Sequence, residues 1–384
     1  MKLSRVSTSV AMTAIAALTL VGCASGDSNG GDTSGGGENG ESTAAAGGIE
    51  YTPAEGLKGS LNATGASSQE KAQLNGWVPG YQEKQSDVTV NYESTGSGAG
   101  RDNFIAGTSD FIGSDRAFKT EEIEKSKFPL CADGSDLVEI PAYISPIAIA
   151  FNVPGVEELN LDAETIAKIY DGKITKWNDE AIASLNDGVE LPDSDITPIH
   201  RGDKSGTTEN FTDYLAEVAP EAWTHEPDKE WPAGLPGEGA DKTGGVADAI
   251  RGGEGTIGYL DASATSDLTT ASIKSGEEFV PYSAEAAAKI VEASELESGR
   301  AETDLSYELN FEGGDGSYPI VLVSYLIGCA EYKDAEKGKL VKDYFSYIIS
   351  DEAQQTAGQE DVAGSAPLSP AVAEKAKAAV DAMK

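Results

Sequence analysis

The sequence predicts an α/β fold in which two lobes are joined by two long strands. Short strand patterns in the first part of the chain each end in a turn of small polar residues. Two longer apolar runs rich in β residues lie at 144–153 and 319–327, and an arginine followed by a helix start lies at 201–211. Because polar turns of open α/β sheets gather at the carboxyl ends of the strands, one site built from such distant segments implies two lobes.

The N-terminal segment has the layout of an export signal. Lys2 and Arg5 precede an apolar run that is too short to span a bilayer. The run ends in Leu-Val-Gly before Cys23, which resembles a bacterial lipobox and implies cleavage of residues 1–22 and lipid attachment to Cys23. The alternative is an ordinary signal peptide with an incidental cysteine. Residues 23–56 are rich in Gly and Ser and are expected to form a flexible tether.

Three strand patterns at the start of the body end in polar turns. They span 60–66, 88–92 and 110–115. Their turns carry Ser67, Ser68 and Gln69, then Ser97, and then Asp115, which reads as an exposed acidic position. After the first strand, Ser67 and Glu70 are spaced as a capping box that would open a helix carrying Leu74, Trp77 and Tyr81.

The rest of the body alternates between helical and strand patterns. The central run is mostly apolar, as expected for a buried strand that crosses between lobes. Residues 294–317 are polar and are expected to be irregular. The expected strands are 137–141 with 144–153, 256–260 and 319–327, and the expected helices are 162–170, 179–185, 245–251, 284–293, 334–349 and a last one from Ala371.

Residues 200–211 carry the most informative motif. Apolar residues recur at helical spacing from residue 211, so a helix should begin near 205–208. These residues are Phe211, Tyr214, Leu215 and Val218. The unpaired N–H groups of a helix start form a site for an anion.

Side chains in the same stretch fit that reading. Gly206 lets an anion approach the backbone, Ser205 and Thr207 add donors, and Arg201 can bind two oxygens at once. The alternatives are a simple N-cap with a surface arginine, or an integrin-type Arg-Gly-Asp tripeptide, which in so short a match is expected by chance.

The charge of the chain limits its partners. The 384 residues are enough for two lobes, and 39% of them are hydrophobic. The formal net charge of −37 argues against nucleic acid and anionic membrane surfaces as partners. Long-range attraction therefore cannot hold an anion here, and short-range hydrogen bonds in a dry site must do so.

The few cysteines and histidines restrict the chemistry. Cys131 and Cys329 would lie in an exported compartment that permits disulfides, and we expect them to pair. The two histidines, His200 and His225, belong to no cluster with metal-ligand spacing, so we expect no metal and no cofactor. We expect His200 to pack beside its strand.

In this order the pieces resemble the phosphate-binding proteins of bacterial phosphate-specific ABC transporters, from about Gly59 to the C-terminus. The most specific segments are 201–207, 110–115 and 92–98. The resemblance implies a periplasmic-binding-protein-like fold of type II, with a ligand cleft between two lobes joined by two crossing strands. One lobe would comprise 57–143 and 318–384 and the other 144–317.

The resemblance also implies a set of phosphate-binding residues. They are Ser97, Asp115, Arg201, Ser205, Gly206 and Thr207, with first-loop donors at Ser67, Ser68 and Gln69. The family often has a threonine and an apolar residue in that first loop, so a shift of one position stays open. Asp203 matches an acidic residue that orients the arginine, the alternative being a turn-forming aspartate.

Asp115 would then test the ligand for a proton. Hydrogen phosphate carries one and sulfate does not, and rejection of a ligand that leaves a buried polar group unpaired is worth about 10⁴-fold or more. The alternative is a solvated acid at a strand end. The implied function is high-affinity capture of phosphate and its delivery to an ABC permease and ATPase, by a monomer lipid-anchored at the outer face of the cell membrane.

Three other functions stay open at this point. A secreted phosphoryl-transfer enzyme is disfavoured because Ser205 has no histidine base in view. A phosphate sensor of the same fold would have the same sequence features. A binder of another oxyanion, such as sulfate or molybdate, would differ in its preference among anions.

Overall fold

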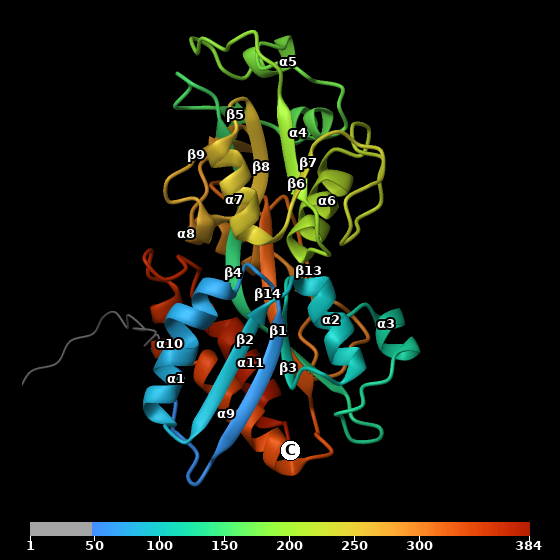
Figure 1. Cartoon of the computed structure of the whole chain (residues 1–384), viewed down its shortest axis with the longest axis vertical. Helices are drawn as coiled ribbons and strands as arrows, with labels where there is room; N and C mark the ends of the chain where they lie inside the picture. The colour runs from blue at the N-terminus through green and yellow to red at the C-terminus, as the bar shows by residue number, and fades with distance from the viewer. Residues whose placement is uncertain (1–47) are drawn as a thin grey trace, which may run out of the picture. The chain divides into compact units, whose positions relative to one another are not determined.

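The computed structural model describes residues 48–384. The expected signal peptide, the lipidation site Cys23 and most of the tether lie outside the described residues. The described residues belong to one structural unit. Strands and helices alternate along it, which confirms the expected α/β class (Figure 1).

A nine-stranded mixed sheet runs through this unit in the order β2-β1-β3-β14-β4-β8-β6-β7, with β9 paired to β4. The strands β2, β1 and β3 at one end are parallel, and β8, β6 and β7 at the other end are parallel. The strands are β1 (Gly59–Gly65), β2 (Val88–Ser94), β3 (Phe111–Ser114), β4 (Leu137–Asn152), β6 (Thr197–Arg201), β7 (Glu238–Ala240), β8 (Thr256–Asp261), β9 (Thr269–Thr270) and β14 (Val321–Cys329).

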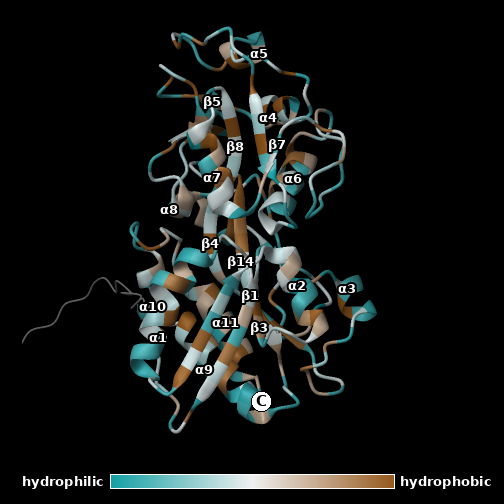
Figure 2. Cartoon of the chain, in the orientation of Figure 1, coloured by the Kyte–Doolittle hydropathy of each residue, from teal (hydrophilic) through white to brown (hydrophobic). Residues whose placement is uncertain are grey.

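Two long strands, β4 and β14, join the two ends of the sheet (Figure 1). Residues 137–146 of β4 pair with β14, and residues 147–152 pair with β8. Nearly every residue of both strands is buried, and Figure 2 shows the colour of hydrophobic residues along β14. Burial on both faces explains why these strands read as continuous apolar runs. The two crossing strands are confirmed.

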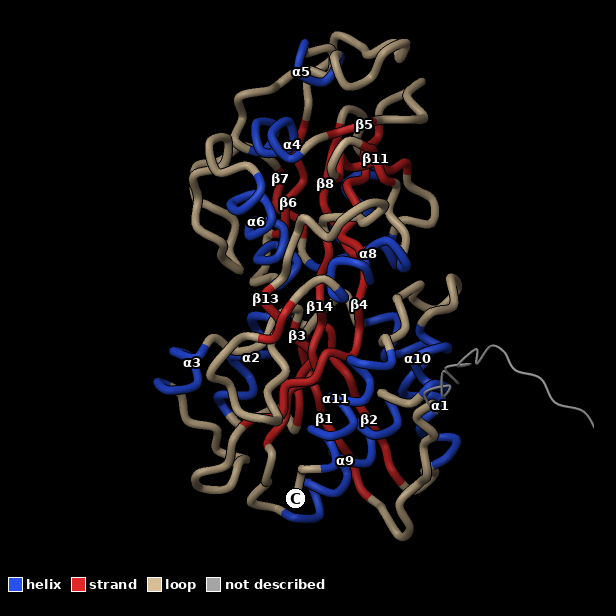
Figure 3. Tube along the Cα trace, turned by 180° about the vertical axis from the view of Figure 1, so that it is seen from behind, coloured by secondary structure: helices blue, strands red, loops and turns tan. Residues whose placement is uncertain are grey.

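Helices cover both ends of the sheet (Figure 3). We call the elements around β1, β2 and β3 the first lobe, and those around β6, β7 and β8 the second lobe. The first lobe holds α1 (Val78–Lys84), α2 (Ser97–Ala106), α3 (Thr120–Lys125), α9 (Ala335–Ile348), α10 (Asp351–Ala357) and α11 (Pro370–Asp381). The second lobe holds α4 (Ala163–Tyr170), α5 (Glu180–Ala183), α6 (Gly206–Val218), α7 (Lys242–Gly252) and α8 (Ala284–Glu292).

The first helical segment differs from the capping-box prediction. The Ser67 Oγ atom pairs with Thr243 Oγ1 at 3.0 Å instead of capping a helix. The segment begins as a π-helix, η1 (Ala72–Trp77), and continues into α1. The wider π-turn buries four of its six residues and turns the Leu74 side chain outward, where it is 44% exposed. The capping-box prediction is therefore wrong.

Other departures are local. Asp115 is 2% exposed and is not an exposed position, whereas Val218, in the last turn of α6, is 44% exposed. The stretch 294–317 is not fully irregular, since it contains a short hairpin. The further short elements are β5 (Asn160–Leu161), η2 (Ala262–Ala264), β10 (Ser272–Ser275), β11 (Glu278–Val280), β12 (Glu295–Leu296) and β13 (Tyr307–Glu308).

Two tertiary links brace the first lobe. Cys131 and Cys329 form a disulfide, as the exported location led us to expect. The bond ties the loop before β4 to the end of β14, two segments separated by 198 residues in sequence. Both segments flank the crossing strands, so the disulfide fixes the ends of β4 and β14 that lie in the first lobe.

The first described residues are tied to α9 and α10. The buried carboxylate of Asp343 accepts hydrogen bonds from the Tyr51 hydroxyl at 2.7 Å and from the Ala54 N–H at 3.1 Å. The Asp351 N–H donates to the Ile49 carbonyl at 2.9 Å, and the Ile49 N–H donates to Asp351 Oδ1 at 3.1 Å. Residues 49–54 are therefore held at a fixed place on the helices α9 and α10.

Candidate functional site

Three loops of the first lobe place polar side chains at one edge of the sheet. Ser67, Ser68 and Gln69 follow β1, Ser97 follows β2 at the start of α2, and Asp115 follows β3. Because these strands are parallel, their carboxyl ends meet at the same edge. All five side chains are at most 4% exposed, so the edge is dry.

The second lobe contributes one strand end and one helix start. Arg201 is the last residue of β6, and α6 begins five residues later. The Ser205 hydroxyl caps the helix by accepting a hydrogen bond from the Thr208 N–H at 3.1 Å. Phe211 stacks on Tyr259 of β8 with ring centroids 4.2 Å apart, which holds α6 on the second lobe. The predicted helix start is confirmed.

The structure brings the two sets of residues together. Thr207 Oγ1 donates to Asp115 Oδ2 at 3.1 Å, and Asn210 Nδ2 donates to the Asp115 carbonyl at 2.7 Å. A Cβ atom on Gly206 would lie 2.7 Å from Ser97 Oγ and 2.7 Å from Asp115 Cβ. Glycine is therefore required for the start of α6 to approach the first lobe this closely.

Hydroxyl groups surround the carboxylate of Asp115. Its Oδ1 atom accepts from Ser68 Oγ and, at 2.7 Å, from Ser324 Oγ, while Oδ2 accepts from Thr207 Oγ1. A carboxylate offers about four acceptor positions, so one position on Oδ2 stays open. The backbone N–H of Asp115 donates to Ser97 Oγ at 3.1 Å, which fixes the turn. Asp115 is thus a buried acceptor aimed at the junction of the lobes.

Arg201 is held rigidly by a neighbouring carboxylate. Its Nε and Nη2 atoms each donate to Asp203 at 2.6 Å, and its side chain is 2% exposed. Burial opposes ionisation of Asp203, but the hydrogen bonds and charge of Arg201 outweigh it and lower the pKa of the carboxyl group. Within the described chain the Nη1 atom meets no acceptor, so one edge of the guanidinium is available to a ligand. Gly96 of the first lobe approaches the same pair, since a Cβ there would lie 2.8 Å from Asp203 Oδ2.

Gln69 has a different position from its neighbours. Its Nε2 atom donates to Ser324 Oγ at 2.8 Å and to the Tyr325 carbonyl at 3.1 Å, and its Oε1 atom accepts from Gln73. The side chain therefore supports β14 and leaves only its backbone for a ligand.

Sequence reasoning missed Ser324, Thr243 and Asn210. Ser324 binds Asp115, Asn210 binds the Asp115 carbonyl, and Thr243 of α7 meets Ser67 across the lobes. A signal existed for Ser324, because it is a single serine inside a mostly apolar strand. Thr243 and Asn210 lie in helices, and no sequence pattern around either residue indicates a place in the site.

Both histidines pack against neighbouring side chains of the second lobe. The His200 ring stacks on Trp231 at 4.8 Å, and His225 pairs with Asp171 at 2.9 Å. No cluster of three or more metal-ligating side chains occurs within residues 48–384. In the same residues no helix is both long and apolar enough to cross a bilayer.

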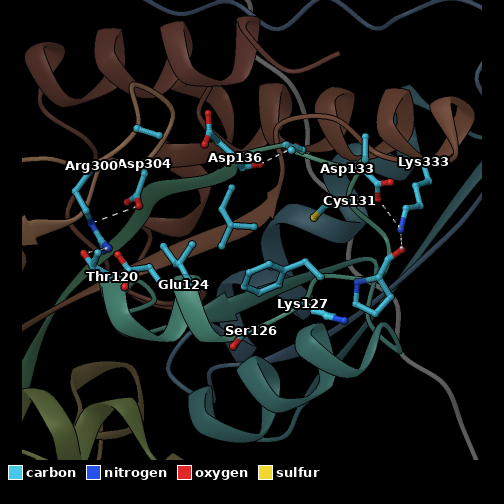
Figure 4. Close-up of a pocket in the computed structure, with 18 of the residues that line it drawn as sticks. Thr120, Glu124, Ser126, Lys127, Cys131, Asp133, Asp136, Arg300, Asp304 and Lys333 are labelled. Carbon is cyan, nitrogen blue, oxygen red and sulfur yellow. Dashed lines mark hydrogen bonds and ion pairs between the residues drawn. The ribbon is translucent and has the colours of Figure 1, made fainter.

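A separate cavity of about 680 Å³ lies beside α3 and the disulfide loop (Figure 4). It contains none of the candidate site residues. Its arginine, Arg300, is already occupied, because Nη2 donates to the Phe118 carbonyl at 2.7 Å and Nε pairs with Asp304 at 3.3 Å. The residues of the candidate site converge elsewhere, at the junction of the lobes.

Comparison with known proteins agrees with this geometry. A family model described as "PBP superfamily domain" matches residues 41–352, so the chain is a binding protein of the PBP superfamily. It is 33% identical to phosphate-binding protein PstS 2 of Mycobacterium tuberculosis over the whole of both chains. It is 35% identical to phosphate-binding protein PstS of Pasteurella multocida over 71% of this chain and 76% of that one. The chain belongs to the PstS family of phosphate-binding proteins.

Solved structures share the fold. A phosphate-binding protein from Stenotrophomonas maltophilia has a TM-score of 0.65 at 20% identity and covers 83% of this chain and 93% of its own. A putative phosphate ABC transporter substrate-binding protein from Clostridium perfringens, solved with bound phosphate, has a TM-score of 0.55 at 21% identity, with 79% and 98% covered. These likenesses confirm the two-lobed fold. The relatives are named as binding proteins, in agreement with the expectation that the chain is not an enzyme.

Proposed function

We propose that this protein binds inorganic phosphate outside the cytoplasm and delivers it to the membrane permease of an ABC transporter. The observation that carries the proposal is the meeting of a buried acceptor, Asp115, with the start of α6 at the junction of the lobes. Arg201 faces the same junction next to Gly96. Relatives named as phosphate-binding proteins, and one named as an ABC transporter component, support the ligand and the partner.

Each group has a distinct role in this proposal. Arg201, oriented by Asp203, supplies the main charge compensation through charge-assisted hydrogen bonds. The Ser205 hydroxyl and the N–H groups of Gly206 and Thr207 supply donors at the positive end of the α6 dipole.

The first lobe completes the cradle. The loops at 67–69 and Ser97 supply donors from the opposite side, and Asp115 receives the ligand proton and so excludes sulfate. Very small ligands gain at most about 1.5 kcal/mol of binding free energy per heavy atom. For phosphate this gives about 7–8 kcal/mol, which corresponds to a Kd near micromolar.

We further propose that the protein is a lipoprotein. Cleavage after residue 22, lipid on Cys23 and the tether 23–56 would hold a monomeric body at the outer face of the cell membrane. The body would divide into 57–143 with 318–384 and 144–317. Mass spectrometry of the membrane-extracted protein tests the lipid, since an N-terminal peptide starting before Cys23 would contradict it.

Calorimetry of the purified protein tests the ligand. Phosphate should bind with one site and should not be displaced by a large excess of sulfate. Titration with molybdate and sulfate alone separates phosphate binding from general oxyanion binding. A protein that binds sulfate as tightly as phosphate, or that binds neither, would overturn the proposed function.

A further inference from the structure

A buried carboxylate on α6 meets three cations of the first lobe. Glu209 lies one turn after Ser205, and its side chain is 8% exposed. Its Oε2 atom lies 2.7 Å from Arg116 Nε and 3.3 Å from Arg101 Nη2, and its Oε1 atom lies 3.2 Å from Lys119 Nζ. A second-lobe anion is thus surrounded by first-lobe cations, immediately beside the candidate site.

The first lobe holds two of these cations by itself. Arg101 Nη1 donates to Ser114 Oγ at 2.8 Å, and Ser114 Oγ donates to the Arg116 carbonyl at 2.6 Å. Arg116 also forms a bidentate pair with Glu122 at 2.6 and 2.9 Å. These bonds lie within one lobe, so they persist when the lobes separate.

The charges of this cluster depend on closure. The first lobe alone contributes three cations, Arg101, Arg116 and Lys119, and only one carboxylate, Glu122, that forms an ion pair with them; Asp115 lies beside them without pairing. Arg101 is only 2% exposed, and burial with the nearby charge of Arg116 lowers its pKa to about 10. Glu209 is the group that compensates these cations, and it arrives only with α6.

We propose that Glu209 is a positioning residue for closure of the lobes. Its carboxylate pairs with the first-lobe cations once the ligand has been captured. In the open protein, Arg101, Arg116 and Lys119 flank Asp115 and attract the anion locally, against the charge of −37 on the whole chain. In the closed protein Glu209 neutralises them and keeps the lobes together. The inference rests on the proposed phosphate binding.

A second ion pair between the lobes is more exposed. Lys204 Nζ pairs with Asp102 Oδ2 at 2.8 Å, and both side chains are about half exposed. Exposed pairs contribute little, whereas breaking a buried pair leaves an uncompensated charge in a dry site. The buried contacts of Glu209 should therefore contribute more than the exposed pair, and Glu209 should control how long the closed state lasts.

Stopped-flow measurement of phosphate association and dissociation, over a range of salt concentrations, tests this role. Glu209→Gln should raise the dissociation rate at least about tenfold with little change in association, since loss of a buried charge partner acts mainly on dissociation. Arg101→Gln should slow association and reduce its salt dependence. Both substitutions remove the contact between Glu209 and Arg101. The dissociation rate of the double variant should therefore rise by less than the product of the increases in the two single variants.

Asp213→Asn is the matched control. Asp213 lies one turn further along α6 and lines the same cavity of about 400 Å³ beside Asp115 and Arg116, but it forms no ion pair with the three cations. Burial and the charge of Glu217 raise the pKa of Asp213 to about 6, so the rates are measured well above that pH, where its carboxylate is charged. The substitution should leave both rates within about twofold. Thermal unfolding checks that each variant is folded, and the salt dependence of the dissociation rate in the unmodified protein reports on the ion pairs without any substitution.

The outcomes separate the two proposals. Two results would overturn the role of Glu209 and leave the proposed function standing. One is phosphate binding by Glu209→Gln with an unchanged dissociation rate, and the other is a dissociation rate in the unmodified protein that salt does not alter. A protein that does not bind phosphate at all overturns both.

Discussion

Replacing Asp115 by asparagine isolates the proton test. The substitution keeps the size of the side chain and removes the acceptor that Ser68, Ser324 and Thr207 now surround. Phosphate loses a hydrogen bond to a charged acceptor, worth about 1.5–3 kcal/mol, which weakens its binding about 10- to 150-fold. Sulfate no longer meets an unpaired buried carboxylate, so its binding should improve.

Competition calorimetry with phosphate and sulfate at fixed ionic strength measures both changes. The dissociation constant for sulfate divided by that for phosphate should fall by at least the factor by which phosphate binding weakens. Asp102→Asn is the control, because it removes a carboxylate of the same lobe from the exposed ion pair and should keep the ratio. A preference for phosphate that survives in Asp115→Asn would refute the proton test, whatever its effect on affinity.

Three other predictions concern the arginine, the disulfide and pH. Arg201→Lys should weaken phosphate binding at least about tenfold in calorimetry, because lysine cannot reproduce the bidentate bond to Asp203; equal affinity would contradict the role of the guanidinium. Replacing Cys131 and Cys329 by serine should lower the free energy of unfolding in urea by about 2–5 kcal/mol, since the bond closes a long loop, and an unchanged urea midpoint would count against it. The pKa of Asp203 is lowered in the folded state, so its stabilisation is present above the unfolded pKa and is lost as pH falls through the folded one. Between about pH 5 and 3 the unfolding free energy should therefore fall more steeply in the unmodified protein than in Asp203→Asn, and parallel curves would refute this.

The crossing strands could be predicted because their burial leaves a direct trace in the sequence. A strand covered on both faces needs long apolar runs, and β4 and β14 have them. The convergence of the polar turns also followed from one rule, that parallel strands share an edge. The helix start at Ser205 was visible from local spacing alone, and its cap has the expected geometry.

Contacts that cross the junction could not be read from local patterns. Ser67 has the spacing of a capping box, but its hydroxyl meets Thr243, which is 176 residues away. The same holds for Glu209, to which the sequence analysis assigns no role and which is buried by cations from the other lobe. The π-turn of η1 was missed as well, because an expected period of 3.6 residues turns Leu74 inward.

The fixed attachment of Ile49 and Tyr51 determines where a mechanical load would enter the body. Asp351 and Asp343 bind these residues on α10 and α9, so a pull from the amino-terminal side is borne by the C-terminal helices of the first lobe. The second lobe lies outside that line of force. If lipid on Cys23 anchors the protein, as proposed above, a pull from that side therefore loads the first lobe alone and does not strain the contacts between the lobes.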